Sequence, residues 1–274
     1  MDASVRQGQI PNGGIAMEAR LPTMSEELQT ASRIRAHLGD VAHLRTQTRE
    51  PGLIAATAAV KQLQSLRFRA TYADFLRSQT HEAATRFFLE ELYGKTDFTE
   101  RDTQFGRIAG AIERLFPAAV GHLAVDLAEI HALSERLDHE MAEHWMSFGR
   151  AGSETSAAKR YVQCWRATSQ REHRDRQLAV VLHMGRELQR LTRIRSVHLA
   201  LKMMRQPAHL AGLSSLQQLL ERGFAAFAAM GDAETFLTAI ENRESAWTAN
   251  MFNTDLAACA QQLALDLSKA QNDQ

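Results

Sequence analysis

The stretch PAAVGHLAVDLAEIHALSERLDHEMAEHWMSF, residues 117 to 148, repeats apolar residues with the period of an α-helix. Pro117 is suited to the first helical turn, because its fixed φ fits a helix and its missing N–H has no acceptor there. The pattern therefore predicts one long amphipathic helix. Its apolar face consists of Val120, Leu123, Leu127, Ile130, Leu137, Met141, Trp145 and Phe148.

The rest of the chain favours helices in the same way. β-Branched residues are sparse, and Ala, Leu, Gln, Glu and Arg dominate the runs between Pro and Gly breakers. A chain of 274 residues can bury a substantial core. We expect an all-α fold, a bundle of about eight to ten helices, formed as a single compact domain or as two interlocked helical subdomains.

Breaker residues divide the chain into four parts. Residues 1–22 contain Pro and Gly without apolar periodicity and are expected to be a disordered tail. Residues 23–148 form an N-terminal helical part, and residues 149–156, rich in small and polar side chains, form a linker. Residues 157–274 are expected to form a C-terminal helical part that packs on the first.

Charge and cysteine content restrict the partners and the location. Lys plus Arg equal Asp plus Glu at 32 each, so no bulk field attracts nucleic acid or an anionic membrane, and any such binding would have to be local. We therefore expect no nucleic-acid partner and no membrane partner. The two cysteines, Cys164 and Cys259, do not suggest a disulfide framework, and with the absence of a secretory signal they predict a cytoplasmic protein.

Polar residues occur on helix faces that are otherwise apolar. His131 and Asp138 lie on the apolar side of the helix over residues 117–148. Arg174 shares a face with apolar residues after the linker, and Arg67 does so on a helix expected to run from Pro51 to near residue 78. Because a buried charge needs a partner, we expect an inward carboxylate at Asp138 or Asp74 to pair with Arg174.

These inward polar residues allow two interpretations. In the first, they form a buried ion-pair network that holds the helices in register. In the second, they line an interior pocket whose arginines bind a carboxylate or a phosphate. The residues expected at such a pocket are Arg67, Tyr72, Asp74, His131, Asp138 and Arg174.

Metal and cofactor chemistry find little support. The segment from His131 to His144 is dense in His, Asp and Glu, but it has neither the Glu-x-x-His pairing of di-iron bundles nor the His-Glu-x-x-His of zincins. The Gly-rich nucleotide loops and the Gly-x-Ser-x-Gly elbow are absent as well. We expect no metal and no cofactor, and the sequence leaves open whether the protein is an enzyme.

Four segments carry a resemblance to a known family: RATYADFL (69–76), RFFLEELYGKTDFTERD (86–102), IHALSERLDHEMA (130–142) and MMRQPAHLAGLSSLQQLLERGFAAFAAMG (203–231). They resemble a family of uncharacterised bacterial proteins known by its FFLEELY motif. The resemblance implies an all-helical cytosolic protein from a Gram-negative bacterium, without an established activity. Residues 86–102 should form a helix-turn-helix corner whose structural positions are Phe87, Phe88, Glu91, Tyr93, Asp97, Arg101 and Asp102.

Two classes of function follow from these features. The missing catalytic motifs favour a non-catalytic adaptor or regulatory scaffold, with a protein partner or a second copy of the chain as its ligand. The alternative is an enzyme or sensor that binds a small anionic ligand in the interior pocket. A closed core of satisfied pairs would support the scaffold, and a polar cavity at the inward arginines would support the pocket.

Overall fold

The computed structural model of the protein describes residues 24–91, 99–115, 118–150 and 156–272. These residues form helices and no strand, which confirms the all-α fold. The expected tail lies outside the described residues, as do residues 151–155 of the expected linker. In chain order the helices are α1 (Met24–Gln47), α2 (Pro51–Thr71), α3 (Ala73–Leu76), α4 (Glu82–Glu91), α5 (Thr99–Leu115), α6 (Ala118–Arg150), α7 (Ala157–Thr168), α8 (Arg171–Thr192), α9 (Arg195–Met203), α10 (Arg205–Leu210), α11 (Ser214–Met230), α12 (Glu234–Asn253) and α13 (Leu256–Asn272).

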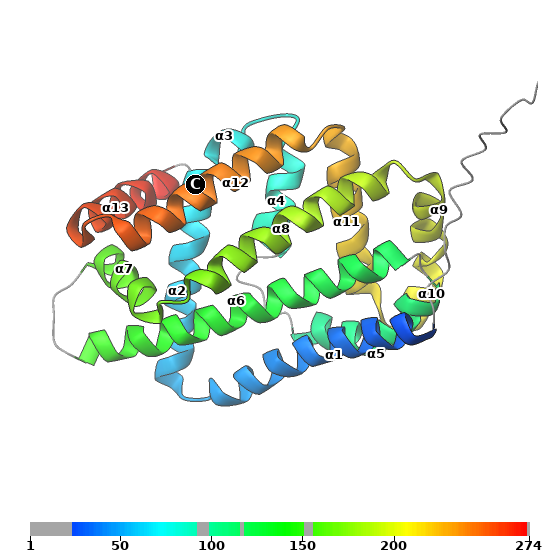
Figure 1. The fold of residues 1–274 in the computed structure, drawn as a ribbon, viewed down its shortest axis with the longest axis horizontal. Coiled ribbons are helices and arrows are strands. Elements are labelled where there is room, and N and C mark those ends of the chain that lie inside the picture. Colours follow the sequence, from blue (N-terminus) through cyan, green and yellow to red (C-terminus); the bar gives the residue numbers. More distant parts are fainter. Residues whose placement is uncertain (1–23, 92–98, 116–117, 151–155, 273–274) are drawn as a thin grey trace, which may run out of the picture.

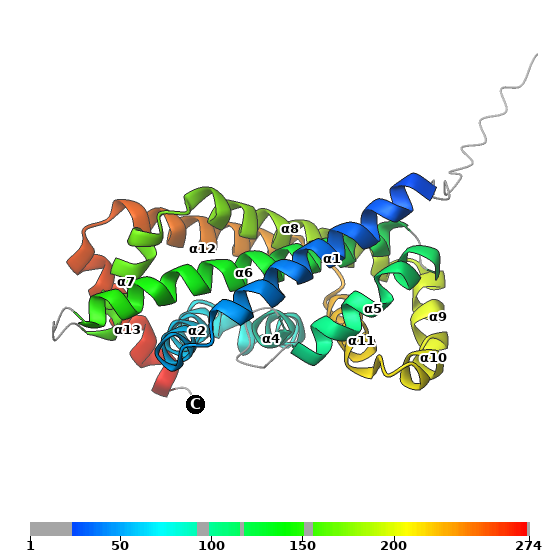
Figure 2. The same cartoon turned by 90° about the horizontal axis from the view of Figure 1, so that it is seen from below.

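Helix α6 lies in the middle of the molecule (Figure 1). It contacts α1 on one side and α8 on the other, and α8 in turn contacts α12, so that these four helices run side by side. Helices α2, α4 and α11 cross this layer on one of its faces, as the turned view shows (Figure 2). The long predicted helix thus has neighbours around most of its circumference.

The apolar face predicted for α6 is buried as expected. Val120, Leu123, Leu127, Ile130, Leu137 and Met141 are all inaccessible to solvent or nearly so. Trp145 and Phe148 near the end of the helix are partly buried. The helix forms because its apolar residues recur every three to four positions, and it is held because this stripe is covered by α1, α2, α7 and α8.

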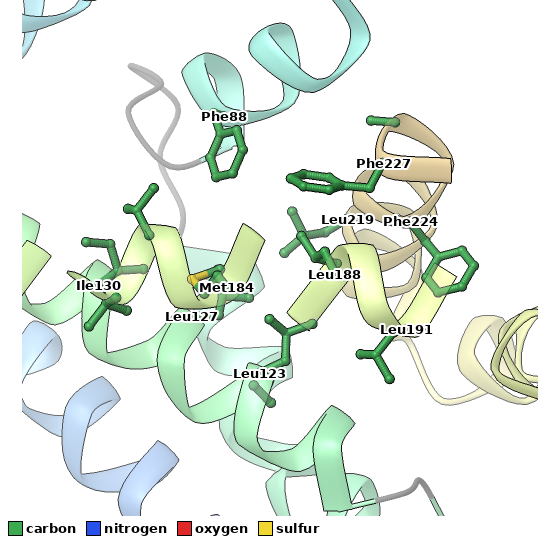
Figure 3. Close-up of a cluster of buried hydrophobic side chains, with 14 of the residues drawn as sticks. Phe88, Leu123, Leu127, Ile130, Met184, Leu188, Leu191, Leu219, Phe224 and Phe227 are labelled. Atoms are coloured by element: carbon green, nitrogen blue, oxygen red, sulfur yellow. The ribbon is translucent and has the colours of Figure 1, made fainter. Parts of the chain in front are cut away.

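The main hydrophobic core combines residues from both sides of residues 149–156. Leu123 and Leu127 of α6 meet Met184 and Leu188 of α8 and Phe227 of α11 in one cluster (Figure 3). A second cluster surrounds Tyr161 and Trp165 of α7 and includes residues of α2, α12 and α13. The buried side chains of Arg67 and Arg174 lie where residues of the two clusters meet.

Two helices that the sequence suggested as continuous are interrupted. The helix expected from Pro51 to near residue 78 ends at Thr71, where Tyr72 takes a non-helical conformation and α3 restarts the chain. The helix expected over residues 157–191 is divided at Ser169, which has a left-handed φ of 50°. Neither position carries Gly or Pro, so the local sequence gives no signal for these breaks.

The FFLEELY segment attaches α4 to α11 and α12. The ring of Phe88 lies 5.8 Å from that of Phe227 and 6.0 Å from that of Phe236. The ring of Phe87 lies against Gly223, where a side chain would occupy the same space. Tyr93 and Asp97 of the expected corner lie outside the described residues.

Replacing Gly185 with alanine should destabilise the protein by about 1–3 kcal/mol, because the added methyl group would overlap with the side chain of Leu237, which is fully buried on α12. Gly39→Ala is the matched control, because Gly39 is exposed on α1 and a Cβ there meets no atom within 4 Å. That control should stabilise the protein by about 0.5–1 kcal/mol. Equal effects of the two substitutions in denaturant unfolding would contradict the close approach of α8 and α12.

Candidate functional site

A cavity with a volume of about 70 Å³ lies among α2, α4, α7, α8 and α12. Its wall combines aromatic and aliphatic side chains with several charged and polar groups, as is usual for small-molecule sites. The polar members of the wall are Gln64, Arg67, Tyr72, Thr85, Arg174, Gln177, Glu244 and Thr248. The apolar members are Phe68, Phe88, Leu89, Trp165, Leu178, Val181, Phe236 and Ile240.

Arg67 is paired with a carboxylate of α12 that also lines the cavity. Its Nη1 donates to both carboxylate oxygens of Glu244, at 2.7 and 2.8 Å, and the hydroxyl of Tyr72 donates to the same carboxylate at 2.7 Å. The guanidinium also lies 3.8 Å from the ring centre of Phe68 and 4.7 Å from that of Trp247. Burial alone would lower the pKa of Arg67, but the Glu244 carboxylate outweighs it and raises this pKa above its usual value.

Arg174 has no such partner. It is 6% exposed, and its guanidinium lies 3.8 Å from the ring centre of Trp165. Its Nη2 donates to the sulfur of Met141 at 3.1 Å, which is a weak acceptor. No carboxylate among the described residues lies within 4.0 Å of it, so the expected ion pair with Asp138 or Asp74 is not formed. Burial lowers the pKa of Arg174.

Asp138 is buried near Arg174 without touching it. Burial raises the pKa of Asp138 to about 6, although Lys61 and Arg174 act in the opposite direction. Lys61 is itself paired with Glu135 at 2.6 Å, so its charge is already compensated. Asp138 therefore balances the charge of Arg174 only through space, and it does not line the cavity.

Several buried hydrogen-bond donors around the cavity lack acceptors. Within the described part of the chain, Arg67 Nε, Trp165 Nε1 and Trp247 Nε1 have no hydrogen-bond partner. The ring centres of Trp165 and Trp247 lie 6.3 Å apart. Buried polar groups in proteins are almost always satisfied. Three buried donors in or beside the cavity wall therefore have no acceptor.

The other predicted pocket residues lie elsewhere. Asp74 is exposed and forms two hydrogen bonds with Arg243, at 2.8 and 2.7 Å. It points outward because α2 ends before it and α3 changes the direction of the chain. His131 belongs to a separate buried cluster, in which Asp102 Oδ2 lies 2.8 Å from His131 Nε2 and 2.7 Å from Arg45 Nη2. Of the six predicted residues, Arg67, Tyr72 and Arg174 line the cavity.

The charged residues of the FFLEELY segment join neighbouring helices. Glu91 of α4 is paired with Arg222 of α11 and lies 3.8 Å from Arg101 of α5. Arg101 also donates to the carbonyl oxygen of Glu91 at 3.1 Å and lies 3.9 Å from Asp102. Through Asp102 the network continues to His131 on α6. Through these contacts Glu91, Arg101 and Asp102 link α4, α5, α6 and α11.

Sequence reasoning missed Glu244, Trp165 and Thr248. A signal for Glu244 is present, because it lies at helical spacing between Ile240 and Met251, which are both buried on α12. A carboxylate on a buried face needs a cationic partner. The pattern could have identified Glu244 as an inward acid, but it could not have identified which arginine it meets.

A second cavity, of about 80 Å³, lies between α5, α6, α8 and α11. Its wall is apolar except for Gln217, whose amide nitrogen already donates to the carbonyl oxygen of Leu201 at 2.7 Å and to Glu221 at 2.9 Å. This space has no charged group to orient a polar ligand, so the cavity at Arg174 is the better candidate.

The segment of the chain that forms the candidate cavity matches a known sequence family. The sequence profile of a family described as a domain of unknown function, DUF8198, matches residues 43–258, which include the whole cavity wall. No helix in the described ranges has the length and apolar character needed to cross a membrane. No curated protein and no solved structure matches the chain. Since the match covers more than half of the sequence, the protein belongs to the family of the domain of unknown function DUF8198.

Proposed function

We propose that the protein is a receptor for a small anion, a compact carboxylate or an inorganic oxyanion, bound at Arg174. The observation that carries this proposal is a buried guanidinium that lines a cavity without a carboxylate within 4.0 Å among the described residues. A buried guanidinium without a direct ion pair is costly, and an anion in the cavity would pair with it. Ligand binding would therefore stabilise the folded protein.

The buried donors without a hydrogen-bond partner support the same class of ligand. An oxyanion presents several acceptor oxygens to Arg174 and to the unpaired donors Arg67 Nε and Trp165 Nε1. Arg67 and Glu244 neutralise each other, so the net positive charge at the cavity wall comes from Arg174. The guanidinium of Arg174 is held in one orientation by the indole ring on which it stacks. A guanidinium in a fixed orientation favours anions whose oxygens can accept two of its N–H groups, such as a carboxylate or a phosphate.

The size of the cavity restricts the ligand further. A volume of about 70 Å³ is far below the roughly 300–1,000 Å³ of sites for drug-sized molecules. The space suits an ion with a few heavy atoms, such as acetate or phosphate. A nucleotide would need the helices to separate.

The receptor proposal reconciles the two functions expected from the sequence. The satisfied pairs at Arg67 and Asp102 support the register-setting role expected of a scaffold. The unpaired Arg174 supports the ligand pocket of the alternative. A regulatory protein that changes its binding to a protein partner or to a second copy of itself when the anion binds would use both features.

The proposal predicts that a small oxyanion raises the melting temperature of the protein. A ligand at a hundred times its dissociation constant adds about 2.7 kcal/mol to the free energy of unfolding. Thermal unfolding would be measured with acetate, phosphate and sulfate, each compared with chloride at the same ionic strength. We expect a saturable shift with at least one of the three oxyanions, and calorimetric titration should give a stoichiometry near one.

Two substitutions on the same helix identify the binding group. Arg174→Met keeps an unbranched apolar stem but removes the charged guanidinium, and it should abolish the shift. Arg176→Met is the matched control, because Arg176 is largely exposed and pairs with Glu129 at 2.6 Å. It should leave the shift unchanged. If no oxyanion stabilises the protein, or if Arg174→Met responds as the unmodified chain does, the receptor proposal is wrong.

We also propose that the family is the group of bacterial proteins known by the FFLEELY motif. The matched range includes residues 87–93, which carry that motif, and covers all four of the segments that bear the resemblance. A cytoplasmic location remains part of this proposal. It is supported by Cys164 and Cys259, which are free thiols and buried.

A further inference from the structure

Helices α9 and α10 lie together at one end of the molecule (Figures 1 and 2). Helix α9 is apolar on two opposite sides. Val197 and Leu201 are buried against the core, whereas Leu199 and Met203 are 59% and 68% exposed. A helix that is apolar on both sides is normally covered on both. Leu210 of α10 is also an exposed apolar side chain, with 83% of its surface accessible to solvent.

The charge of this region differs from that of the whole chain. No Asp or Glu occurs between Glu187 and Glu221, although the chain has equal numbers of acidic and basic residues. Arg190 pairs with Glu187 and Arg205 pairs with Glu221. Three other basic side chains of this region, Arg193, Arg195 and Lys202, have no carboxylate within 4.0 Å among the described residues. All three are exposed.

We propose that α9 and α10 bind the surface of an anionic phospholipid bilayer. Projecting apolar side chains flanked by basic residues fit the boundary between lipid headgroups and acyl chains. The apolar tips would enter this boundary, while Arg193, Arg195 and Lys202 would contact phosphate groups. The balanced total charge, from which we expected no membrane partner, conceals this local excess of positive charge.

The shape of the surface favours a bilayer over a protein partner. Of the five large apolar side chains exposed among the described residues, three lie here, and all three project into solvent. A protein partner would need preformed pockets for side chains that project this far, whereas lipid chains adapt to them. No described helix could cross the bilayer, so the contact would be peripheral. Neither α9 nor α10 contributes a residue to the wall of the Arg174 cavity.

The test is sedimentation of the full chain with lipid vesicles. Vesicles of phosphatidylcholine alone would be compared with vesicles in which roughly a third of the lipid is phosphatidylglycerol. We expect binding to the anionic vesicles only, and weaker binding as salt screens the charges. Each basic residue beside an anionic bilayer contributes a factor of about five, so Arg195→Ala with Lys202→Ala should weaken binding roughly 25-fold.

The apolar contribution has its own variant. Met203→Ser with Leu210→Ser should weaken binding at least tenfold, on the order expected for two apolar side chains leaving lipid. The matched controls are Leu265→Ser on α13, where the side chain is 50% exposed, and Lys159→Ala on α7, and neither should change binding. Because all of these positions are exposed, the melting temperatures of the variants should stay the same.

Two results would overturn the proposal. One is failure of the unmodified chain to sediment with the anionic vesicles. The other is equal binding by the double variants and the controls. If the chain does not bind vesicles but binds an acidic protein, and if this binding is lost in the Arg195→Ala and Lys202→Ala double variant, the surface is a protein-binding site and the lipid proposal is wrong.

Discussion

Glu244→Gln should lower the free energy of unfolding by about 3–5 kcal/mol, the largest loss we expect from a single substitution outside the apolar core. The side chains of Arg67 and Glu244 are 4% and 15% exposed, so the neutral amide would leave a buried guanidinium without a compensating charge. Tyr72 would also lose its charged acceptor. Denaturant unfolding at neutral pH measures the loss directly.

The matched control uses the same kind of ion pair on the surface. Asp74 pairs with Arg243 at 2.7 Å, but its side chain is largely exposed, so Asp74→Asn should cost less than about 1 kcal/mol. A double variant, Arg67→Met with Glu244→Leu, should recover much of the loss, because it removes both buried charges. A loss for Glu244→Gln no larger than that for Asp74→Asn would contradict the buried pair.

Asp138→Asn should change the pH dependence of stability by up to about 3 kcal/mol. The pKa of Asp138 is raised from its usual value of 3.8 to about 6 in the folded protein. Between about pH 4 and pH 6 the folded state therefore holds a proton that the unfolded state has released, and stability falls as pH rises. Asparagine does not titrate, so the variant gains stability relative to the unmodified chain over this window.

The comparison needs unfolding curves at about pH 4 and about pH 7, on either side of the titration. Asp74→Asn serves as the control with the opposite sign. The hydrogen bond and charge of Arg243 lower the pKa of Asp74, so its contribution to stability is present at neutral pH and is lost on acidification. A difference between Asp138→Asn and the unmodified chain that stays constant with pH would contradict the raised pKa of Asp138.

The class of fold and the long central helix can be predicted from the amino-acid sequence alone. The apolar period over residues 117–148 and the position of Pro117 depend only on neighbours within a few residues, which is the range over which a helix is encoded. The same reasoning identified Arg67 and Arg174 as inward residues, and both line the cavity. It failed at Tyr72 and Ser169, where helices end without a Gly or Pro signal.

Which charged groups form ion pairs depends on the packing of the helices and cannot be predicted from the sequence. Arg67 and Glu244 are 177 positions apart in the chain, and no helical period relates them. Asp74, expected to point inward, lies at the surface because α2 ends before it. The packing of α6 against α8 places Arg174 near Asp138 but not in contact with it. A local pattern specifies that a side chain points inward. Its partner depends on how whole helices pack, because side chains from several helices fill the core together.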